Sequence, residues 1–537
     1  MKKLIIQQKT SDETINLALD TLDSKKQAII FVNNKRSAES TAEKISKHLR
    51  ENKETNELSK KILNILSNPT KQCIRLSNTV NKGIAFHHSG LLAEQRKIIE
   101  DNFKKGIIKI IVATPTLAIG VDLPAFRVII RDLKRYGLWG MEYIPVLEYE
   151  QQAGRAGRPS YDNYGEAIII ADNEKQKQEL IEKYIKGKPE EIISKLASEP
   201  ILRTYILSLI ASEFVSNKKS LREFFNKTFY AKQYGDSKKL NAIIEKIIQQ
   251  LTKWNFLENE TKEKNKEKNI SENTYFTSAH KIGNNSDENI KATPIGKRVS
   301  ELYLDPYTAN HLIESMKIIN ETKNSDITIL HMLCSCLELR PLLRVKTSEY
   351  DEIESFLINN EEYIINKINQ YEDEYDEFLN ILKTSKFFID WLEEKDEEYM
   401  LEKYDIRPGE IYSKIEIMDW LIYSSIELSR MLKLNSINKE LMKLRIRIKY
   451  GVKEELLPLL QLKNIGRVRA RILFRNNIKN IADVKKIDIT NLSRILGKNI
   501  AVDIKRQVGQ EFSEEKIRVK ENKRKGQINL NDFNKPS

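Results

Sequence analysis

The sequence predicts a multidomain protein with α/β and all-α parts, and three observations support this fold class. The chain has 537 residues, too many for one hydrophobic core and enough for about three to five domains. Between residues 27 and 170, short β-branched runs alternate with polar loops and helical patterns, which is typical of a parallel α/β sheet. Between residues 307 and 442, long helical patterns contain few glycines or prolines. We therefore expect a sheet domain followed by helical domains.

The first expected strand, at residues 27–32, is an apolar run followed by polar residues 33–36 and a helical pattern that extends to Leu49. Strand, loop and helix in this order form the repeating unit of parallel sheets. Ligands of such sheets bind in the loops that follow the carboxyl ends of the strands. Further strands are expected at residues 107–113, 126–130 and 168–170.

Composition favours an anionic partner. Lysine and arginine outnumber aspartate and glutamate by 90 to 77, a net charge of +13, which favours nucleic acid, although general surface charge would give the same count. The three cysteines, Cys73, Cys334 and Cys336, are too few and too badly spaced for a disulfide framework or a zinc site. We expect buried thiols and no metal centre. Without a signal peptide or an apolar run of about 18 residues, we expect a soluble intracellular protein with no membrane partner.

Three segments of the first region are rich in glycine and polar residues. They are FHHSGL at residues 86–91, TPTLAIGVDLPA at residues 114–125 and QQAGRAGRP at residues 151–159. The second and third resemble helicase motifs V and VI, and the first is similar to a segment of the Ski-type helicases of superfamily 2. Asp122 departs from the asparagine common in the Ski-type group. The resemblance implies that residues 1–185 form the second RecA-like domain of a helicase motor.

Motif VI is implied to face ATP. Phosphoryl transfer needs fixed positive charge on the γ-phosphate, and guanidinium groups are permanently charged and fork-shaped. Arg155 and Arg158 are therefore the expected arginine fingers, and their spacing predicts that both lie on one face of a helix, with Gln151 one turn earlier. A surface loop rich in glycine and arginine is the alternative. Further cofactor contacts are expected from Gly120, Asp122 and Gly154.

Motif V and the neighbouring loops are implied to contact the DNA backbone, because hydroxyl and main-chain N–H groups suit phosphate oxygens. Residues 131–146 lie where relatives that unwind DNA carry a strand-separating β-hairpin, whose apolar tip can stack on a broken base pair. An ordinary hairpin packed on a neighbouring domain is the alternative. The nucleic-acid contacts expected in this domain are Asn34, Arg36, Ser89, Thr114, Thr116, Tyr136 and Trp139.

The motifs of a first motor domain do not occur in this sequence. A complete motor needs a G-x-x-x-x-G-K-[ST] loop for phosphate and a DExH motif for magnesium, and neither pattern is present. We therefore expect ATP and Mg²⁺ to be bound chiefly by a first RecA-like domain, supplied by a separate chain.

The next two expected domains resemble a winged helix at residues 195–305 and a helical ratchet bundle at residues 306–445. The winged helix contains a polar insertion at residues 258–291, with few apolar residues, which we expect to be a mobile wing. After a break at Pro408 and Gly409, a helix from Glu410 to Leu434 is expected. Its Trp420 matches the family's base-stacking tryptophan, although core packing is the alternative. Lys414 is a further expected contact, and Ser413 stands where the family has arginine.

Residues 450–510 resemble a helix-hairpin-helix domain, whose glycine turn offers main-chain N–H groups to a phosphate. The expected contacts are Gly466, Arg467, Arg469 and Arg471, and Asn464 stands at the usual first glycine. Residues 511–537 form a basic tail with a Q-x-x-L-x-x-F box, similar to peptides that bind sliding clamps. The box residues are Gln527, Leu530 and Phe533.

Taken in order, these domains resemble the archaeal fork-repair helicases of the Ski-type group. The resemblance implies ATP-dependent 3'-5' movement on single-stranded and forked DNA, in the cytoplasm at the nucleoid. An RNA helicase of the exosome or spliceosome branch and a non-catalytic DNA-binding subunit are the alternatives. The helix-hairpin-helix and the clamp-like tail favour DNA, and the intact Gln151, Arg155 and Arg158 favour a working motor.

Overall fold

The computed structural model describes residues 5–51, 53–66, 68–137, 140–158, 162–235, 237–259, 289–321 and 325–510. It divides into two compact units, one formed by residues 1–300 with 396–415 and the other by residues 301–395 with 416–537. A parallel sheet lies in the first unit, and the second unit is helical in its described part. The expected fold class, α/β plus all-α, is confirmed.

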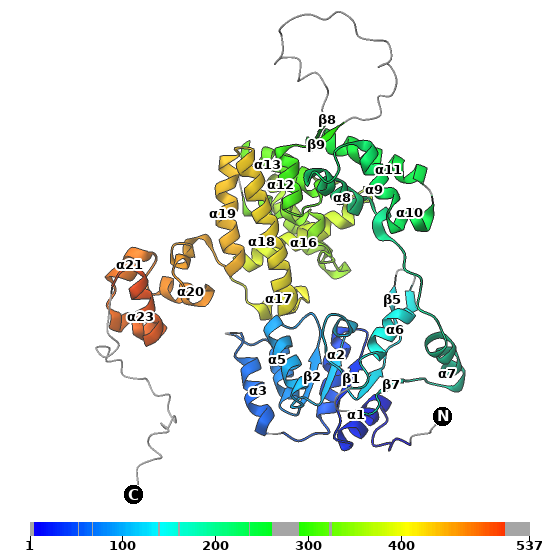
Figure 1. Cartoon of the computed structure of the whole chain (residues 1–537). Helices are drawn as coiled ribbons and strands as arrows, with labels where there is room; N and C mark the ends of the chain where they lie inside the picture. Colours follow the sequence, from blue (N-terminus) through cyan, green and yellow to red (C-terminus); the bar gives the residue numbers. More distant parts are fainter. Residues whose placement is uncertain are drawn as a thin grey trace, which may run out of the picture. The chain divides into compact units, whose positions relative to one another are not determined.

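The first unit contains a five-stranded, all-parallel sheet with the strand order β2-β3-β1-β4-β7 (Figure 1). Four of the strands correspond to expected ones, and the last starts two residues and ends one residue before the expected range. The strand β2 was not expected, because FHHSGL was interpreted only as a motif. The bounds are β1 Ala28–Phe31, β2 Ile84–His87, β3 Ile110–Ala113, β4 Arg127–Ile130 and β7 Glu166–Ile169.

The three central strands are fully buried, because helices cover both faces of the sheet. Arg127 is a buried cation at the start of β4, and its guanidinium contacts Asp20 at 2.8 Å and Glu166 at 2.7 Å. These ion pairs join the first helix, β4 and β7. The helices of this domain are α1 Glu13–Asp23, α2 Lys35–Ser46, α3 Lys53–Leu63, α4 Lys71–Val80, α5 Ala93–Lys104, α6 Val146–Ala153 and α7 Glu174–Leu180.

Between β4 and α6 lies an antiparallel hairpin of β5 Lys134–Gly137 and β6 Gly140–Tyr143. A hairpin was expected here. Its base is held by cation–π contacts, since the ammonium groups of Lys134 and Lys183 lie 4.5 and 4.8 Å from the centre of the Tyr143 ring. Tyr184 donates its hydroxyl to Ile144 O at 2.8 Å. The base of the hairpin is therefore held against residues 181–185.

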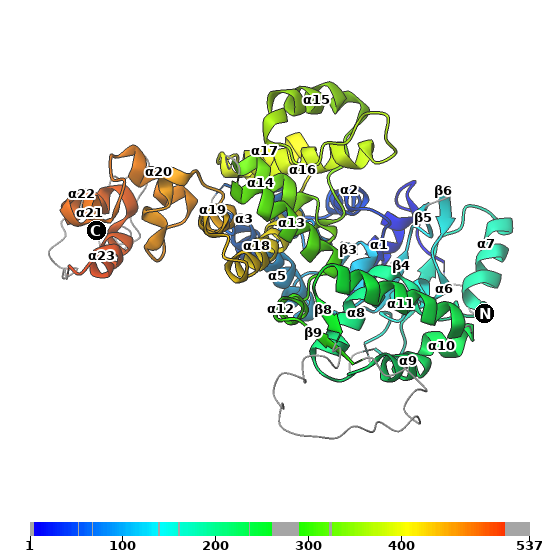
Figure 2. The same cartoon turned by 90° about the horizontal axis from the view of Figure 1, so that it is seen from above.

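In its described residues, the winged helix of the first unit consists of four helices, a two-stranded wing and α12 Pro294–Glu301 after the wing. The antiparallel strands β8 Leu257–Asn259 and β9 Ile290–Ala292 pair through Leu257 and Ala292, so the ends of the expected insertion at 258–291 are strands rather than mobile chain. Residues 260–288 of that insertion lie outside the described residues. The helices are α8 Glu199–Ala211, α9 Lys218–Asn226, α10 Phe229–Tyr234 and α11 Ser237–Lys253 (Figure 2).

Residues 396–415 belong to the first unit although they follow it by almost 100 positions. They comprise α17 Glu397–Tyr404 and the start of α18 Pro408–Met431. The expected break lies at residues 405–407, and α18 starts at Pro408 rather than at Glu410, because proline is tolerated in the first turn of a helix. Gly409 N donates to Gly90 O at 3.0 Å, and a Cβ at Gly409 would lie 2.2 Å from Leu91 O. Only glycine permits this approach of the helix to the FHHSGL loop.

The second unit is built mainly from long helices. Buried Phe378, Leu382 and Phe387 line one helix of its core, and the indole N–H of Trp391 donates to Ile448 O at 2.8 Å. These helices are α13 Pro306–Glu321, α14 Asp326–Cys334, α15 Tyr350–Asn359, α16 Tyr375–Leu392 and α19 Asn435–Tyr450, together with α18 beyond residue 415.

The last described domain has a small core of its own, with Leu456, Leu473 and Leu492 fully buried. Asn464 has a φ of +65°, so the asparagine adopts the left-handed conformation that glycine usually supplies at this turn. The helices are α20 Arg467–Arg475, α21 Ile481–Lys486, α22 Ile489–Leu496 and α23 Lys498–Gln507 (Figure 2).

All three cysteines are buried free thiols, as expected. Among the described residues, no three His, Cys, Asp or Glu side chains are arranged to hold a metal ion. The described helices include none that is both long and apolar enough to cross a membrane.

Candidate nucleic-acid interface

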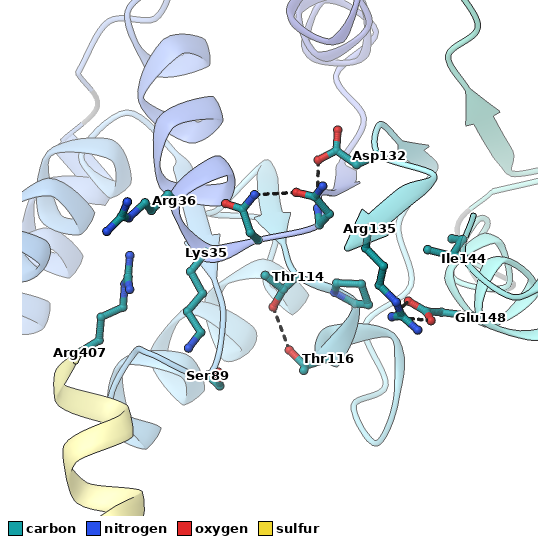
Figure 3. Close-up of a pocket in the computed structure, with 13 residues that line it drawn as sticks. Lys35, Arg36, Ser89, Thr114, Thr116, Asp132, Arg135, Ile144, Glu148 and Arg407 are labelled. Carbon is teal, nitrogen blue, oxygen red and sulfur yellow. Dashed lines mark hydrogen bonds and ion pairs between the residues drawn. The ribbon is translucent and has the colours of Figure 1, made fainter. Parts of the chain in front are cut away.

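A pocket of about 640 Å³ lies where four parallel strands end (Figure 3). The chain after β1 contributes Asn34, the chain after β2 contributes Ser89, and the chain after β3 contributes Thr114. Ligands of open parallel sheets bind at this edge. The lining residues are Asn33, Asn34, Lys35, Arg36, Ser89, Thr114, Pro115, Thr116, Asp132, Arg135, Ile144, Glu148 and Arg407.

Five residues expected to contact nucleic acid meet in this pocket, although they come from three separate loops. Local hydrogen bonds position two of these loops. The Asn34 side chain caps α2 by accepting from Ser37 N at 2.8 Å, and the Thr114 and Thr116 hydroxyls lie 3.0 Å apart. Ser89 and Thr116 are exposed. The five are Asn34, Arg36, Ser89, Thr114 and Thr116.

Four cationic side chains line the pocket, and each is paired with a carboxylate. Arg36 lies 2.7 Å from Asp405, and Lys35 pairs with Glu410. Arg407 Nε donates to Glu39 at 3.0 Å. The fourth pair is Arg135 with Glu148, at 2.8 Å. Four cations beside exposed hydroxyls make a surface suited to phosphate oxygens.

Sequence reasoning missed three of these cations, Lys35, Arg135 and Arg407. Lys35 was visible in the polar run after the first strand. Arg407 lies 368 positions from Glu39, so only the fold brings it to the pocket. Arg135 lies on the hairpin, where only the aromatic residues were expected to contact nucleic acid.

Glu39 is the centre of a buried polar network behind the pocket. Its carboxylate accepts from Gln72 at 2.9 Å and from Arg75 at 2.6 Å, in addition to Arg407. Burial opposes its ionisation, but hydrogen bonds from His88 and Gln72 and the charge of Arg407 hold its pKa well below the ordinary value. Burial also lowers the pKa of His88. The ionised Glu39 therefore fixes Arg407 beside the FHHSGL loop.

Motif VI does not form the helix that was expected. The helix α6 ends at Ala153, Gly154 follows it, and Gly157 has a φ of +94°, which a helix does not allow. Arg155 and Arg158 consequently lie in an irregular turn and do not share a helix face. Glycines at both positions release the chain from α6.

The two arginines of motif VI make different contacts. Arg155 Nε donates to Ala118 O at 3.1 Å, which joins motif VI to motif V. Arg158 donates to Asp162 at 2.7 Å and to Gln27 Oε1 at 2.6 Å. Gln151, Gly154, Gly120 and Asp122, the other expected ATP-facing residues, are all exposed.

The β5–β6 hairpin presents Tyr136 and Met141, which are 84% and 53% exposed. The expected contact Trp139 lies outside the described residues. Tyr136 does not line the pocket, but its neighbour Arg135 does. The hairpin and the pocket are therefore adjacent parts of one surface.

In the second unit, Trp420 is partly buried and donates its indole N–H to Leu302 O at 3.0 Å. This bond fixes the ring and leaves part of its surface exposed. Along the same helix, Lys414 is partly buried and Ser413 is exposed.

The glycine turn before α20 has open space around Gly466, which is the N-cap of the helix. Arg469 is exposed beside it. Arg471 differs from the expectation, because it lies 2.5 Å from Glu394 and 2.6 Å from Glu455. These two carboxylates raise its pKa and neutralise its charge, which does not favour a phosphate contact. Arg467 lies over the Trp391 ring at 5.0 Å.

The expected clamp-binding residues Gln527, Leu530 and Phe533 lie outside the described residues, as does the whole of the tail at 511–537.

Comparison with known proteins shows where the chain belongs. It is 39% identical to the ATP-dependent DNA helicase Hel308 of Methanococcus vannielii, over 94% of this chain and 68% of the relative. The Hel308 proteins of Pyrococcus horikoshii and Pyrococcus abyssi are 36% and 37% identical, over 95% of this chain and 67% of each relative. The chain belongs to the Hel308 family of archaeal DNA helicases.

Three family models match separate parts of this Hel308-family chain. The conserved helicase C-terminal domain matches residues 11–160, which hold four of the five sheet strands, most of the pocket lining and motifs V and VI. A helix-turn-helix domain matches residues 165–258, and domain 4 of archaeal helicases matches residues 327–451. The pocket thus lies in the helicase part, apart from Arg407, which comes from the range matched by domain 4.

Proposed function

We propose that this chain is the C-terminal part of an ATP-dependent 3'-5' DNA helicase that acts on forked DNA in replication-fork repair and recombination. The observation that carries the proposal is the pocket, where five independently expected residues meet at one sheet edge. The pocket would bind the phosphate backbone of the translocating strand. Family membership supports DNA as the substrate, because the relatives are named DNA helicases.

The pocket offers the two kinds of group that bind a phosphate without reading a base. The exposed hydroxyls of Ser89 and Thr116 can donate hydrogen bonds, and Arg36 and Arg135 supply charge from partly or fully exposed positions. Phosphate contacts of this kind position a strand but carry no sequence information. Binding should therefore be independent of sequence and sensitive to salt.

Arg155 and Arg158 are the proposed arginine fingers, with Gln151 beside the attacking water. ATP with Mg²⁺ supplies the phosphoryl group whose hydrolysis drives movement, and both would be bound chiefly by a first RecA-like domain. Arg155 would exchange Ala118 O for a γ-phosphate oxygen, so nucleotide binding would release motif V. This release would link ATP to the strand in the pocket.

The sequence has no phosphate-binding loop or DExH motif, so we propose that a first RecA-like domain outside these 537 residues completes the motor. A separate chain that carries this domain is the proposed partner, with the sliding clamp as a second partner through the tail. The cytoplasm, at the nucleoid, is the proposed location.

The other expected contacts have supporting roles in this proposal. The exposed Tyr136 would stack on the last base pair of the duplex, and Trp420 with Lys414 would hold the strand between steps. The turn at Gly466 with Arg469 would bind a phosphate, while Arg471 would stabilise the domain.

Strand separation tests the proposal. The chain would be mixed with a first RecA-like domain from a Hel308 relative and given ATP with forked duplexes that carry either a 3' or a 5' single-stranded tail. We expect unwinding from the 3' tail only. Tyr136→Ala should slow unwinding about tenfold or more, the range for one base–aromatic stack, without weakening single-strand binding. The matched control is Tyr371→Ala, an exposed tyrosine of the second unit.

The same mixture distinguishes the alternatives. Unwinding of an RNA duplex in preference to DNA would indicate an RNA helicase of the exosome or spliceosome branch. Tight binding of forked DNA without any unwinding would indicate a non-catalytic DNA-binding subunit.

A further inference from the structure

The ion pair of Arg135 and Glu148 forms part of the pocket wall. Arg135 Nη1 lies 2.8 Å from Glu148 Oε2 and 3.0 Å from Oε1 (Figure 3). The Arg135 side chain is 49% exposed and that of Glu148 is 17% exposed. An anion that enters from solvent can therefore reach the cation while the carboxylate stays at the wall.

This pair differs from the other ion pairs of the pocket. The carboxylates Glu39, Asp405 and Glu410, which hold the other three cations, do not line the pocket themselves. Asp132 does line it, but it accepts from Asn33 N at 3.0 Å. Glu148 is therefore the carboxylate of the described lining that faces both the pocket and one of the pocket's own cations.

The position of Glu148 connects the pocket to motif VI. Glu148 lies in the first turn of α6, and α6 ends two residues before Arg155. At the N-terminus of α6, Glu190 accepts from Val146 N at 2.7 Å and Leu147 N at 3.1 Å. Arg135 belongs to the hairpin. One ion pair thus joins the hairpin, the pocket and the helix that leads to the proposed arginine finger.

We propose that Glu148 is a positioning residue that occupies Arg135 until a backbone phosphate of single-stranded DNA takes its place. A phosphate in the pocket attracts Arg135 and repels Glu148, so the ion pair opens when the strand binds. When Glu148 is freed, α6 shifts. This shift makes the position of Arg155 depend on whether a strand occupies the pocket. The inference rests on the proposed function, since it assigns the strand to this pocket.

Binding of fluorescently labelled oligo(dT) to the chain alone tests the exchange without ATP. Glu148→Gln should bind about two- to fivefold more tightly than wild type, the range that an exposed ion pair supports. Arg135→Ala should bind more weakly. Adding Glu148→Gln to Arg135→Ala should change the affinity no further, because the carboxylate acts through that guanidinium.

The matched control is Glu150→Gln, an exposed glutamate of the same helix. It loses the same charge and should leave the affinity within twofold of wild type. An equal gain for Glu148→Gln and Glu150→Gln would overturn the proposal, as would a full gain from Glu148→Gln in the Arg135→Ala background. Both pair members reach solvent, so neither change removes a buried contact.

Hydrolysis tests the link to motif VI. With a first RecA-like domain added, the ratio of ATP hydrolysis with oligo(dT) to hydrolysis without it should fall in Glu148→Gln and stay unchanged in Glu150→Gln. An unchanged ratio in Glu148→Gln would contradict the link. Absence of hydrolysis in the wild-type mixture would contradict the proposed function instead, and the oligo(dT) affinities would still decide the exchange.

Discussion

At the scale of single residues, the pocket shows what a motif can and cannot specify. Asn34 and Thr116 could be predicted, because polar residues directly after apolar runs mark the ligand edge of a parallel sheet. Ser89 was expected only from the resemblance of FHHSGL to the Ski-type segment. Arg407 could not be predicted, because its place depends on the packing of Gly409 against the FHHSGL loop. The pairing of Arg135 with Glu148 could not be predicted either, because it depends on how the hairpin and α6 are arranged in the fold.

Thr116 offers the sharpest test of the pocket, because valine matches its shape and removes only the hydroxyl. We expect Thr116→Val to weaken oligo(dT) binding about tenfold, as for the loss of one hydrogen bond to a charged phosphate. Fluorescence anisotropy measures this effect. The control is Thr204→Val in α8, whose hydroxyl is bonded to Pro200 O. Equal affinities for the two variants would place the strand elsewhere.

Asp162 carries a pH-dependent part of the stability. Hydrogen bonds from Arg158, and then from Lys26, overcome the effect of burial and lower the pKa of Asp162 from 3.8 to about 2. A carboxylate with a lowered pKa stabilises the fold above its unfolded pKa, and this contribution disappears as the pH falls through the folded pKa.

Asp162→Asn should therefore destabilise the sheet domain by about 1 to 2 kcal/mol at neutral pH. The difference from wild type should shrink below pH 3.8 and vanish only below pH 2, as the pH falls through the folded pKa. Thermal unfolding of both proteins at several pH values measures it. The exposed Asp172→Asn is the control, and a difference that stayed constant down to pH 2 would show that the charge of Asp162 is not the cause.

At the scale of elements, the hydrophobic pattern predicted most strands of the sheet correctly. The backbone conformation of motif VI was predicted wrongly. The strands β1, β3 and β4 are fully buried β-branched runs, which is the pattern that a parallel sheet imposes. The strand β2 was not predicted, because its residues Ile84–His87 overlap the FHHSGL motif. In motif VI, arginine spacing predicted a helix, whereas the glycines determine the backbone and produce a turn.

The turn before α20 shows that the sequence alone does not reveal which arginines are free to bind phosphate and which are paired with carboxylates. The three arginines look alike in sequence, but Arg469 is exposed while Arg471 is held by two carboxylates. Arg469→Ala should weaken DNA binding and lower the slope of log affinity against log salt by about 1. Arg471→Ala should leave that slope unchanged and lower the melting temperature. Reversed results would mean that Arg471 leaves Glu394 and binds DNA.

At the scale of the whole molecule, the α/β plus all-α fold class was predictable, because each kind of domain carries its own hydrophobic pattern or motif. The helicase C-terminal, helix-turn-helix and archaeal domain 4 models match in that order along the chain. The return of residues 396–415 to the first unit was not predictable, because the break at Pro408 and Gly409 marks a helix boundary but does not show which domain the helix packs against.

Steady-state ATP hydrolysis tests the central claim, that this chain is one half of a helicase motor, most directly. It would be measured with oligo(dT) for the chain alone, for a first RecA-like domain alone, for their mixture, and for the mixture with Arg158→Ala. The account predicts DNA-stimulated hydrolysis only in the wild-type mixture, with a loss in the variant. Equal hydrolysis by the first domain alone and by the mixture would contradict it.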